Sequence, residues 1–218
     1  MCNKLSIKDT CSMFIHVCDK VIENEAFLTQ LDKKIGDGDH GTVMSIGFTK
    51  AKQILESTEF TSINHVFKEI GITLIKFMGG TSGVIFGTLF TGGIRDLEDV
   101  EALDLEIMVK IFRGALSAIK KRGKAQLGDK TMVDALEPAV VSLEDCLASN
   151  LSLHEAIKTG SASAKVGAEK TKEYVSRVGR SKSYGEHSLG LQDAGATSVQ
   201  IIFEAMEEWL QEKNAVSA

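Results

Sequence analysis

The chain has 218 residues, of which 43% are hydrophobic and 25% charged. That composition is typical of a globular protein able to bury a core, and we expect residues 1–218 to form one domain. The net charge of −5 argues against nucleic-acid binding, and no apolar run is long enough to cross a membrane. The four cysteines form no CxxC pair and no signal peptide is evident, which predicts a cytoplasmic protein.

Helical periodicity runs along the chain, whereas no stretch keeps the two-residue alternation of a strand, so an all-α fold is predicted. Eight helices are expected: 6–29, 41–56, 61–78, 82–92, 103–121, a sixth starting at 128–129, 152–174, and a last one led in by 193–198. The short connections predict antiparallel neighbours. Residues 176–192 form the longest irregular stretch, and loops of that length are usually functional or mobile.

The first candidate site lies between the first two predicted helices, where Asp32, Asp37 and Asp39 are interleaved with glycines. Glycine permits sharp turns, so these carboxylates can point at one spot, where they repel unless a cation lies between them. Oxygen ligands suit Mg²⁺ first, with Ca²⁺ or Mn²⁺ as alternatives. The segment is not an EF-hand, because the fifth position counted from Asp37 is Gly41. The alternative is a solvated turn without a metal.

A second glycine-rich turn, residues 79–83, joins the third and fourth predicted helices. Its free backbone amides and the N-terminus of the next helix are suited to binding phosphate. Because it lacks the lysine of a P-loop, a nucleotide would have to be held differently, and an ordinary helix–helix turn is the alternative.

Single residues in the later loops allow both a functional and a plain interpretation. Gly123 could let a flat ring approach the backbone beside Met132, or Met132 could simply fill the core. Arg180 could bind phosphate or be a solvated loop residue, and Asp193 could be only a helix cap.

His40, beside the three aspartates, could act as a base or could form a hydrogen bond with phosphate or backbone. Metal ligation is not expected of it, because Mg²⁺ prefers oxygen ligands.

These loops fall at alternate helix junctions, which lie at one end of an up-and-down bundle. The motifs I-G-D-G-D-H-G, M-G-G-T-S-G, G-D-K-T-M-V-D-A-L and S-Y-G-E-H-S-L-G-L-Q-D-A-G-A-T-S occur in this order along nearly the whole chain. Together they resemble the nucleotide (ADP)-binding L subunit of the bacterial dihydroxyacetone kinase family. The first and third motifs are specific when they occur together.

The resemblance implies an eight-helix antiparallel up-and-down barrel with a nucleotide, ADP or ATP, at one rim. It implies two Mg²⁺ ions held by the three aspartates. The implied nucleotide-binding residues come from each rim loop: His40, Gly41, Thr42, Val43, Gly80, Thr81, Ser82, Gly123, Met132, Arg180, Asp193, Ala194 and Gly195.

The resemblance also implies partners. In that family the sugar is bound covalently to a histidine of a separate sugar-binding kinase subunit. In the phosphotransferase-dependent branch a third, phosphohistidine-bearing subunit rephosphorylates the bound ADP, whereas in the other branch ATP exchanges. The chain departs from the family pattern at Thr42-Val43, Ala194 and His187, which bears on the nucleotide contacts, the branch and the sugar.

The resemblance therefore implies phosphoryl transfer to dihydroxyacetone or a related short ketose, in the phosphotransferase-dependent branch. Such transfer depends on positioning and charge neutralisation more than on covalent help from the protein. Because no sugar-linking histidine is evident, the chain alone should not phosphorylate a ketose. Alternatives are an ATP-exchanging subunit for a four-carbon ketose, a non-catalytic ADP-binding regulatory module, and a barrel that carries a lipid.

Overall fold

The computed structural model of the chain describes residues 3–216 and confirms an all-α protein. Two 3₁₀ segments, η1 (Thr171–Glu173) and η2 (Arg180–Ser188), and two short strands, β1 (Lys4–Ser6) and β2 (Ala102–Asp104), accompany the α-helices. Within the described range these are α1 (Ile7–Glu23), α2 (Glu25–Ile35), α3 (His40–Ser57), α4 (Ile63–Met78), α5 (Gly80–Thr91), α6 (Leu105–Gly123), α7 (Val133–Ala148), α8 (Leu153–Lys170) and α9 (Ala194–Val216).

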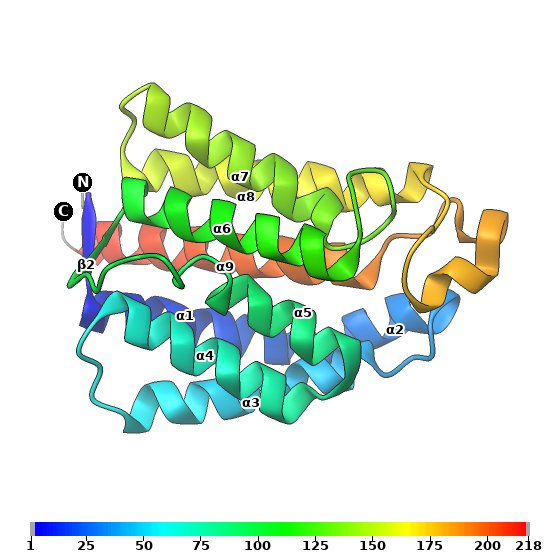
Figure 1. The fold of residues 1–218 in the computed structure, drawn as a ribbon, viewed down its shortest axis with the longest axis horizontal. Coiled ribbons are helices and arrows are strands. Elements are labelled where there is room, and N and C mark those ends of the chain that lie inside the picture. Colours follow the sequence, from blue (N-terminus) through cyan, green and yellow to red (C-terminus); the bar gives the residue numbers. More distant parts are fainter. Residues whose placement is uncertain (1–2, 217–218) are drawn as a thin grey trace.

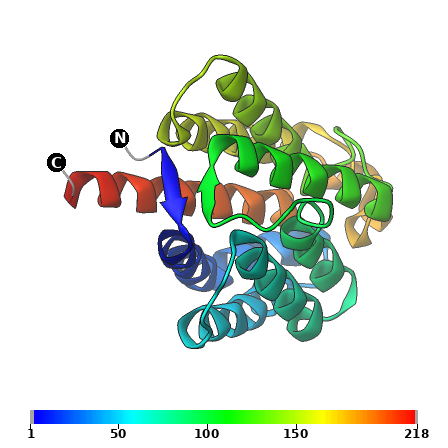
Figure 2. The same cartoon turned by 60° about the vertical axis from the view of Figure 1, so that its left-hand side comes forward.

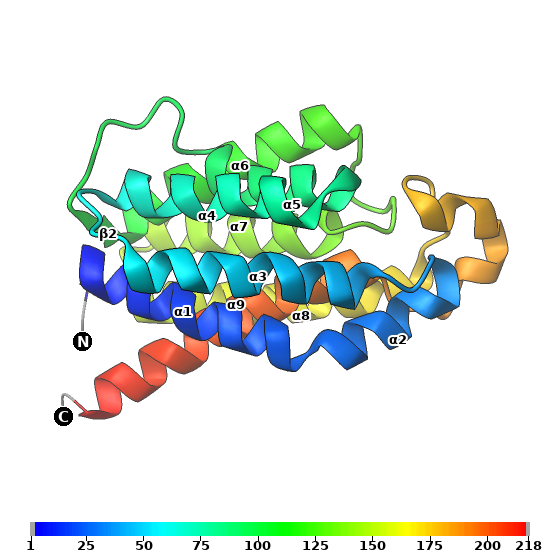
Figure 3. The same cartoon turned by 90° about the horizontal axis from the view of Figure 1, so that it is seen from below.

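The helices form an antiparallel up-and-down barrel. From α2 to α9 each helix packs on the next one in sequence, and α1 packs on both α9 and α3, which closes the ring (Figure 1 and Figure 3). Phenylalanines fill the interior, with Phe14 in edge contact with Phe67 at 5.0 Å and with Phe90 at 5.6 Å between ring centroids. Such contacts add to the burial of apolar area that stabilises the barrel.

The two ends of the barrel differ. The loops α2–α3, α4–α5, α6–α7 and α8–α9 gather at one end, on the right of Figure 1, as the alternation of the glycine-rich loops predicted. We call this end the rim. At the other end β1 pairs antiparallel with β2, and the last turns of α9 project past the barrel (Figure 2). Three-residue strands are too short for a visible alternation, which is why the sequence did not reveal them.

Several helix boundaries correct the sequence predictions. The expected first helix is two helices, because the chain breaks at Asn24, whose backbone and side-chain N–H groups both cap the Lys20 carbonyl. Next, α5 begins at Gly80 instead of Ser82. Then α7 begins at Val133 instead of residues 128–129, since Gly128 has a positive φ, as do Lys124 and Lys130. Finally, the expected seventh helix ends earlier, as α8 followed by η1.

Among residues 3–216, no helix combines the length and the apolar character that a membrane crossing requires.

Candidate functional site

A cavity of about 540 Å³ opens at the rim, within the size range of small-molecule sites. It brings together most of the site residues predicted from the sequence. Gly41 and Thr42 are the two that do not line it: Gly41 packs against α2, and the Thr42 hydroxyl donates to Glu25 at 3.2 Å. The predicted residues that do line it are Asp32, Asp37, Asp39, His40, Val43, Gly80, Thr81, Ser82, Gly123, Met132, Arg180, Asp193, Ala194 and Gly195.

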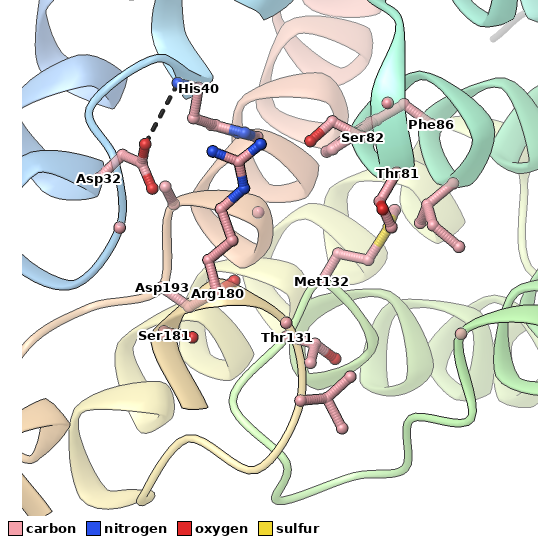
Figure 4. Close-up of a pocket in the computed structure, with 18 of the residues that line it drawn as sticks. Asp32, His40, Thr81, Ser82, Phe86, Thr131, Met132, Arg180, Ser181 and Asp193 are labelled. Atoms are coloured by element: carbon pink, nitrogen blue, oxygen red, sulfur yellow. Dashed lines mark hydrogen bonds between the residues drawn. The ribbon is translucent and has the colours of Figure 1, made fainter. Parts of the chain in front are cut away.

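The three carboxylates converge beside the mouth of the cavity. One oxygen from each of Asp32, Asp37 and Asp39 lies within 4.8 Å of the other two. Asp32, at the end of α2, is fixed by accepting a hydrogen bond from the backbone N–H of Gly38 at 2.8 Å. It accepts a second one from the backbone N–H of His40 at 3.3 Å (Figure 4). This all-oxygen set, open on the side of the two exposed aspartates, fits a hard divalent cation.

Glycine is required in this loop for two separate reasons. A Cβ on Gly36 would lie 2.0 Å from Asp32 Oδ1, so any other residue would displace that carboxylate. Gly38 has a φ of +78°, which L side chains rarely adopt. The sequence pattern of alternating Asp and Gly thus corresponds to a backbone that folds tightly around the Asp32 side chain.

The segment that contains η2 folds over the carboxylates from the opposite side of the rim. Arg180 forms ion pairs with Asp37 and Asp39, and Figure 4 shows its side chain reaching toward the α2–α3 loop. The Tyr184 hydroxyl donates to the Gly36 carbonyl at 3.1 Å. The longest irregular stretch predicted from the sequence therefore contacts the carboxylate loop directly.

The turn between α4 and α5 presents backbone amides to the cavity. Gly79 and Gly80 have φ values of +66° and +55°, and α5 begins at Gly80. The first N–H groups of a helix have no partner within it, and the helix dipole adds a partial positive charge there. Thr81 and Ser82 add hydroxyl groups at the same edge (Figure 4). This edge is suited to binding anionic oxygen atoms.

The deeper part of the cavity has an apolar wall. Ile85, Phe86 and Met132 contribute to it, and the sequence had singled out only Met132. The sequence pattern around Ile85 and Phe86 is that of an ordinary buried helix face, so it did not indicate them as site residues. Beside them Gly123 leaves open space, since an added Cβ would have Ile85 as its nearest neighbour at 3.6 Å. Surfaces of this kind are suited to contact with a flat apolar ring.

His40 is buried and begins α3. Its Nε2 is 2.9 Å from the Ser198 hydroxyl, which in turn donates to the Ala194 carbonyl at 3.0 Å. Burial lowers the pKa of His40, which favours the neutral imidazole. His40 therefore connects the start of α3 to α9, and Ser198, which the sequence did not single out, is its partner.

Asp193 is held where α9 begins. Its Oδ2 accepts a hydrogen bond from the Ala196 N–H at 2.7 Å, so the helix-cap interpretation is correct, while the same residue also lines the cavity. Burial raises the pKa of Asp193 to about 7. The adjoining Gly195 lies against the Met132 backbone, because a Cβ on Gly195 would be 3.6 Å from Met132 N.

The sequence analysis missed two buried charged residues, Lys130 in the α6–α7 loop and Asp134 in the first turn of α7. Asp134 accepts hydrogen bonds from the backbone N–H groups of Gly128 at 2.5 Å and Thr131 at 2.7 Å, so it shapes this loop. Lys130 lines the cavity and is almost entirely buried. A charged residue in a loop normally indicates solvent exposure, so its burial could not be read from the sequence.

A family model of the DAK2 domain matches residues 34–208. The chain belongs to the DAK2 domain family. The matched range begins two residues after Asp32, near the end of α2, and ends within α9, so all four rim loops of this DAK2 chain fall within it.

Two curated relatives match over nearly their whole length. The chain is 37% identical over 190 residues to the ADP-binding subunit of PEP-dependent dihydroxyacetone kinase from Escherichia coli, covering 87% of this chain and 90% of the relative. It is 36% identical over 190 residues to the ADP-binding subunit of PTS-dependent dihydroxyacetone kinase from Lactococcus lactis, covering 87% and 91%.

A solved structure supports the fold. The DAK2 chain matches the dihydroxyacetone kinase of C. freundii in complex with AMP-PNP and Mg²⁺, with a TM-score of 0.71 and 27% identity. The match covers 91% of this chain, which spans about a third, 33%, of that longer protein.

Proposed function

We propose that this protein is the nucleotide-binding subunit of a dihydroxyacetone or related short-ketose kinase. It holds ADP or ATP with Mg²⁺ and transfers the γ-phosphoryl group to a sugar on a separate subunit. The observation that carries this proposal is that three convergent carboxylates, a helix N-terminus and an apolar wall line one cavity. The relatives' names, ADP-binding subunits of dihydroxyacetone kinases, agree with that arrangement.

The proposed metal ligands are Asp32, Asp37 and Asp39, and we propose that they hold two Mg²⁺ ions. Three carboxylates leave a net positive charge with two divalent ions, which favours a polyphosphate. Bound there, Mg²⁺ supplies charge neutralisation at the phosphate oxygens. The AMP-PNP and Mg²⁺ complex of the C. freundii kinase supports a nucleotide together with this metal.

The chain's own residues then have separate roles in the proposal. The amides at the start of α5, with Thr81 and Ser82, bind phosphate oxygens where negative charge develops during transfer. Gly123 and Met132 flank the base, and residues 193–195 close the adenosine end. Arg180 is placed to move from the carboxylates to a phosphate, where a guanidinium can bind two oxygens at once.

We propose that the sugar comes from a partner because the cavity is already accounted for by the nucleotide. Among the described residues, His40 is the one histidine that lines it. His40 is bonded to Ser198 and is proposed to position the site instead of binding a sugar. The partner is then a sugar-binding kinase subunit docked at the rim. The PEP-dependent and PTS-dependent names of the relatives support a phosphohistidine-bearing subunit as phosphate donor.

The place of action proposed is the cytoplasm. Cys11, Cys18 and Cys146 are free thiols, as expected in a reducing compartment, while Cys2 lies outside the described residues.

The deciding experiment measures ketose phosphorylation by three samples: this chain alone, a sugar-binding subunit alone, and the two mixed. Each is supplied either with ATP and Mg²⁺ or with a phosphohistidine donor. We expect turnover only in the mixture, and the better donor identifies the branch. Turnover by the isolated chain at the rate of the mixture would refute the two-subunit proposal. A mixture containing Asp37→Asn is the matched inactive control.

A further inference from the structure

Lys130 is the one lysine among the largest fully buried side chains of the described residues, with 1% of its surface exposed. It lies in the α6–α7 loop with a φ of +62°, two residues before Met132. Its ammonium group donates hydrogen bonds to the backbone carbonyls of Thr171 and Leu191. Thr171 follows α8, and Leu191 lies two residues before Asp193.

These bonds join the loop that carries Met132 to the segment that leads into Asp193. Residues of both segments line the cavity. The backbone N–H of Asp193 donates to the Thr171 hydroxyl at 3.0 Å, so Thr171 binds Lys130 through its carbonyl and Asp193 through its side chain. The Arg177 N–H donates to the Asp129 carbonyl at 3.2 Å and adds a second link between the loops. Lys130, which itself lines the cavity, thereby links the loop that carries Met132 to the segment that leads to Gly195.

A buried ammonium needs a reason, because removing it from water is costly unless it is bonded and faces negative charge. Here the two carbonyls supply bonds, and the Thr171 carbonyl lies at the negative end of α8. Burial lowers the pKa of Lys130, and the negative charges of Asp193 and Asp134, when ionised, act against that shift. A methionine would fill the same space without the cost of removing a charged group from water. The directed bonds to the two carbonyls are what a methionine could not provide.

We propose that Lys130 is a positioning residue that sets the distance between the Met132 wall and the 193–195 turn, and so the fit of the nucleoside part of the nucleotide. The proposal rests on the proposed function, since it concerns the same cavity. Among the described residues, the hydrogen bonds of the Lys130 ammonium go to Thr171 and Leu191, and none goes to the carboxylate loop or to the α4–α5 turn. Its loss should therefore affect nucleoside binding and spare phosphate binding.

The test compares Lys130→Met with the wild-type chain by calorimetry, using magnesium ADP and magnesium pyrophosphate as separate probes. We expect the affinity for ADP to fall about tenfold or more, as for lost bonds to a charged group, and the affinity for pyrophosphate to stay unchanged. Lys158→Met, at an exposed position of α8, is the matched control and should change neither affinity. Equal losses for both probes, or no loss for ADP, would overturn the proposal.

A second pair of variants decides the matter if Lys130→Met does not fold. Thr171→Val removes the hydroxyl that accepts the Asp193 N–H at nearly constant volume, while Thr171→Ser keeps it. We expect the valine variant to lose ADP affinity but not pyrophosphate affinity, and the serine variant to behave like wild type. Identical ADP binding by both would refute the proposal. A wild-type chain that binds neither probe with Mg²⁺ would instead refute the proposed function.

Discussion

Arg180 forms an ion pair with Asp37, and its Nη1 also lies 3.8 Å from Asp39 Oδ2. The guanidinium thus occupies the charge-neutralising position that a divalent ion would take among the same carboxylates. Because η2 carries Arg180 and also bonds Gly36 through Tyr184, the segment that closes over the rim is held by the carboxylate loop. A metal bound as proposed would compete with Arg180 for these oxygens.

This competition predicts opposite effects of one substitution on two ligands. Arg180→Ala should tighten binding of Mn²⁺ in the absence of nucleotide, because the carboxylates lose a competing cation, and it should weaken binding of ADP with Mg²⁺, because a phosphate partner is lost. Electron paramagnetic resonance of free Mn²⁺ and calorimetry with ADP measure the two effects. Arg180→Lys keeps the charge and should lie between. Weaker Mn²⁺ binding by Arg180→Ala would contradict the competition.

Asp37→Asn should abolish the effect of divalent ions on nucleotide binding and leave the fold intact. In the wild-type chain, ADP with Mg²⁺ should raise the free energy of unfolding by about 2.7 kcal/mol at a hundredfold excess over Kd, and ADP with a chelator should not. The variant should show neither increase, with a thermal midpoint of the ligand-free protein equal to or above that of wild type. The reason is that one of three repelling carboxylates is removed, although its bond to Arg180 is lost as well.

Asp96→Asn, on the exposed loop between α5 and β2, is the control for that experiment and should respond to Mg²⁺ and ADP like wild type. A clear fall in the stability of ligand-free Asp37→Asn would show that Asp37 supports the fold instead of a metal.

Gly41→Ala should destabilise the barrel. A Cβ at this position would lie 2.1 Å from the Glu25 carbonyl oxygen and 2.3 Å from Thr29 Oγ1, so α3 would have to move away from α2. Overpacking of this kind costs about 1–3 kcal/mol, measurable by urea denaturation. Gly123→Ala is the matched control at the end of α6, where there is room for a Cβ, and its stability should not fall. Equal effects of the two substitutions would rule out the close packing of α2 on α3 as the cause.

The carboxyl group of Asp193 should give stability a defined pH dependence. Its pKa is raised from 3.8 to about 7 by burial, so between these pH values the native state holds a proton that the unfolded chain has released. This group therefore lowers stability as pH rises through that window and has no further effect above it. Asp193→Asn keeps an acceptor for the Ala196 N–H but does not ionise.

The free energy of unfolding of Asp193→Asn minus that of wild type should accordingly increase from about pH 4 to pH 7 and then level off. Chemical denaturation at several pH values without nucleotide measures it. Asp145→Asn, exposed on α7, provides the comparison. A difference that stays constant across the window would mean that Asp193 ionises normally in the native protein.

The sequence by itself determined the helical class, the approximate place of each long helix and the end of the barrel at which the loops meet. These depend on local periodicity and on glycine positions, both of which are written along the chain. It also indicated the Asp32, Asp37 and Asp39 cluster, because Asp side chains separated by so few residues in a tight glycine-containing turn lie close together in space.

What only the tertiary structure decided are the relationships between distant segments. That Lys130 is buried, that Arg180 pairs with Asp37, and that Ser198 bonds His40 all depend on loops separated by many residues meeting at the rim. No local pattern encodes such pairs, because a lysine, an arginine or a serine in a loop is equally compatible with solvent exposure. The break at Asn24 is of the same kind, since packing of α2 on α3 overrides a helical periodicity that continues through it.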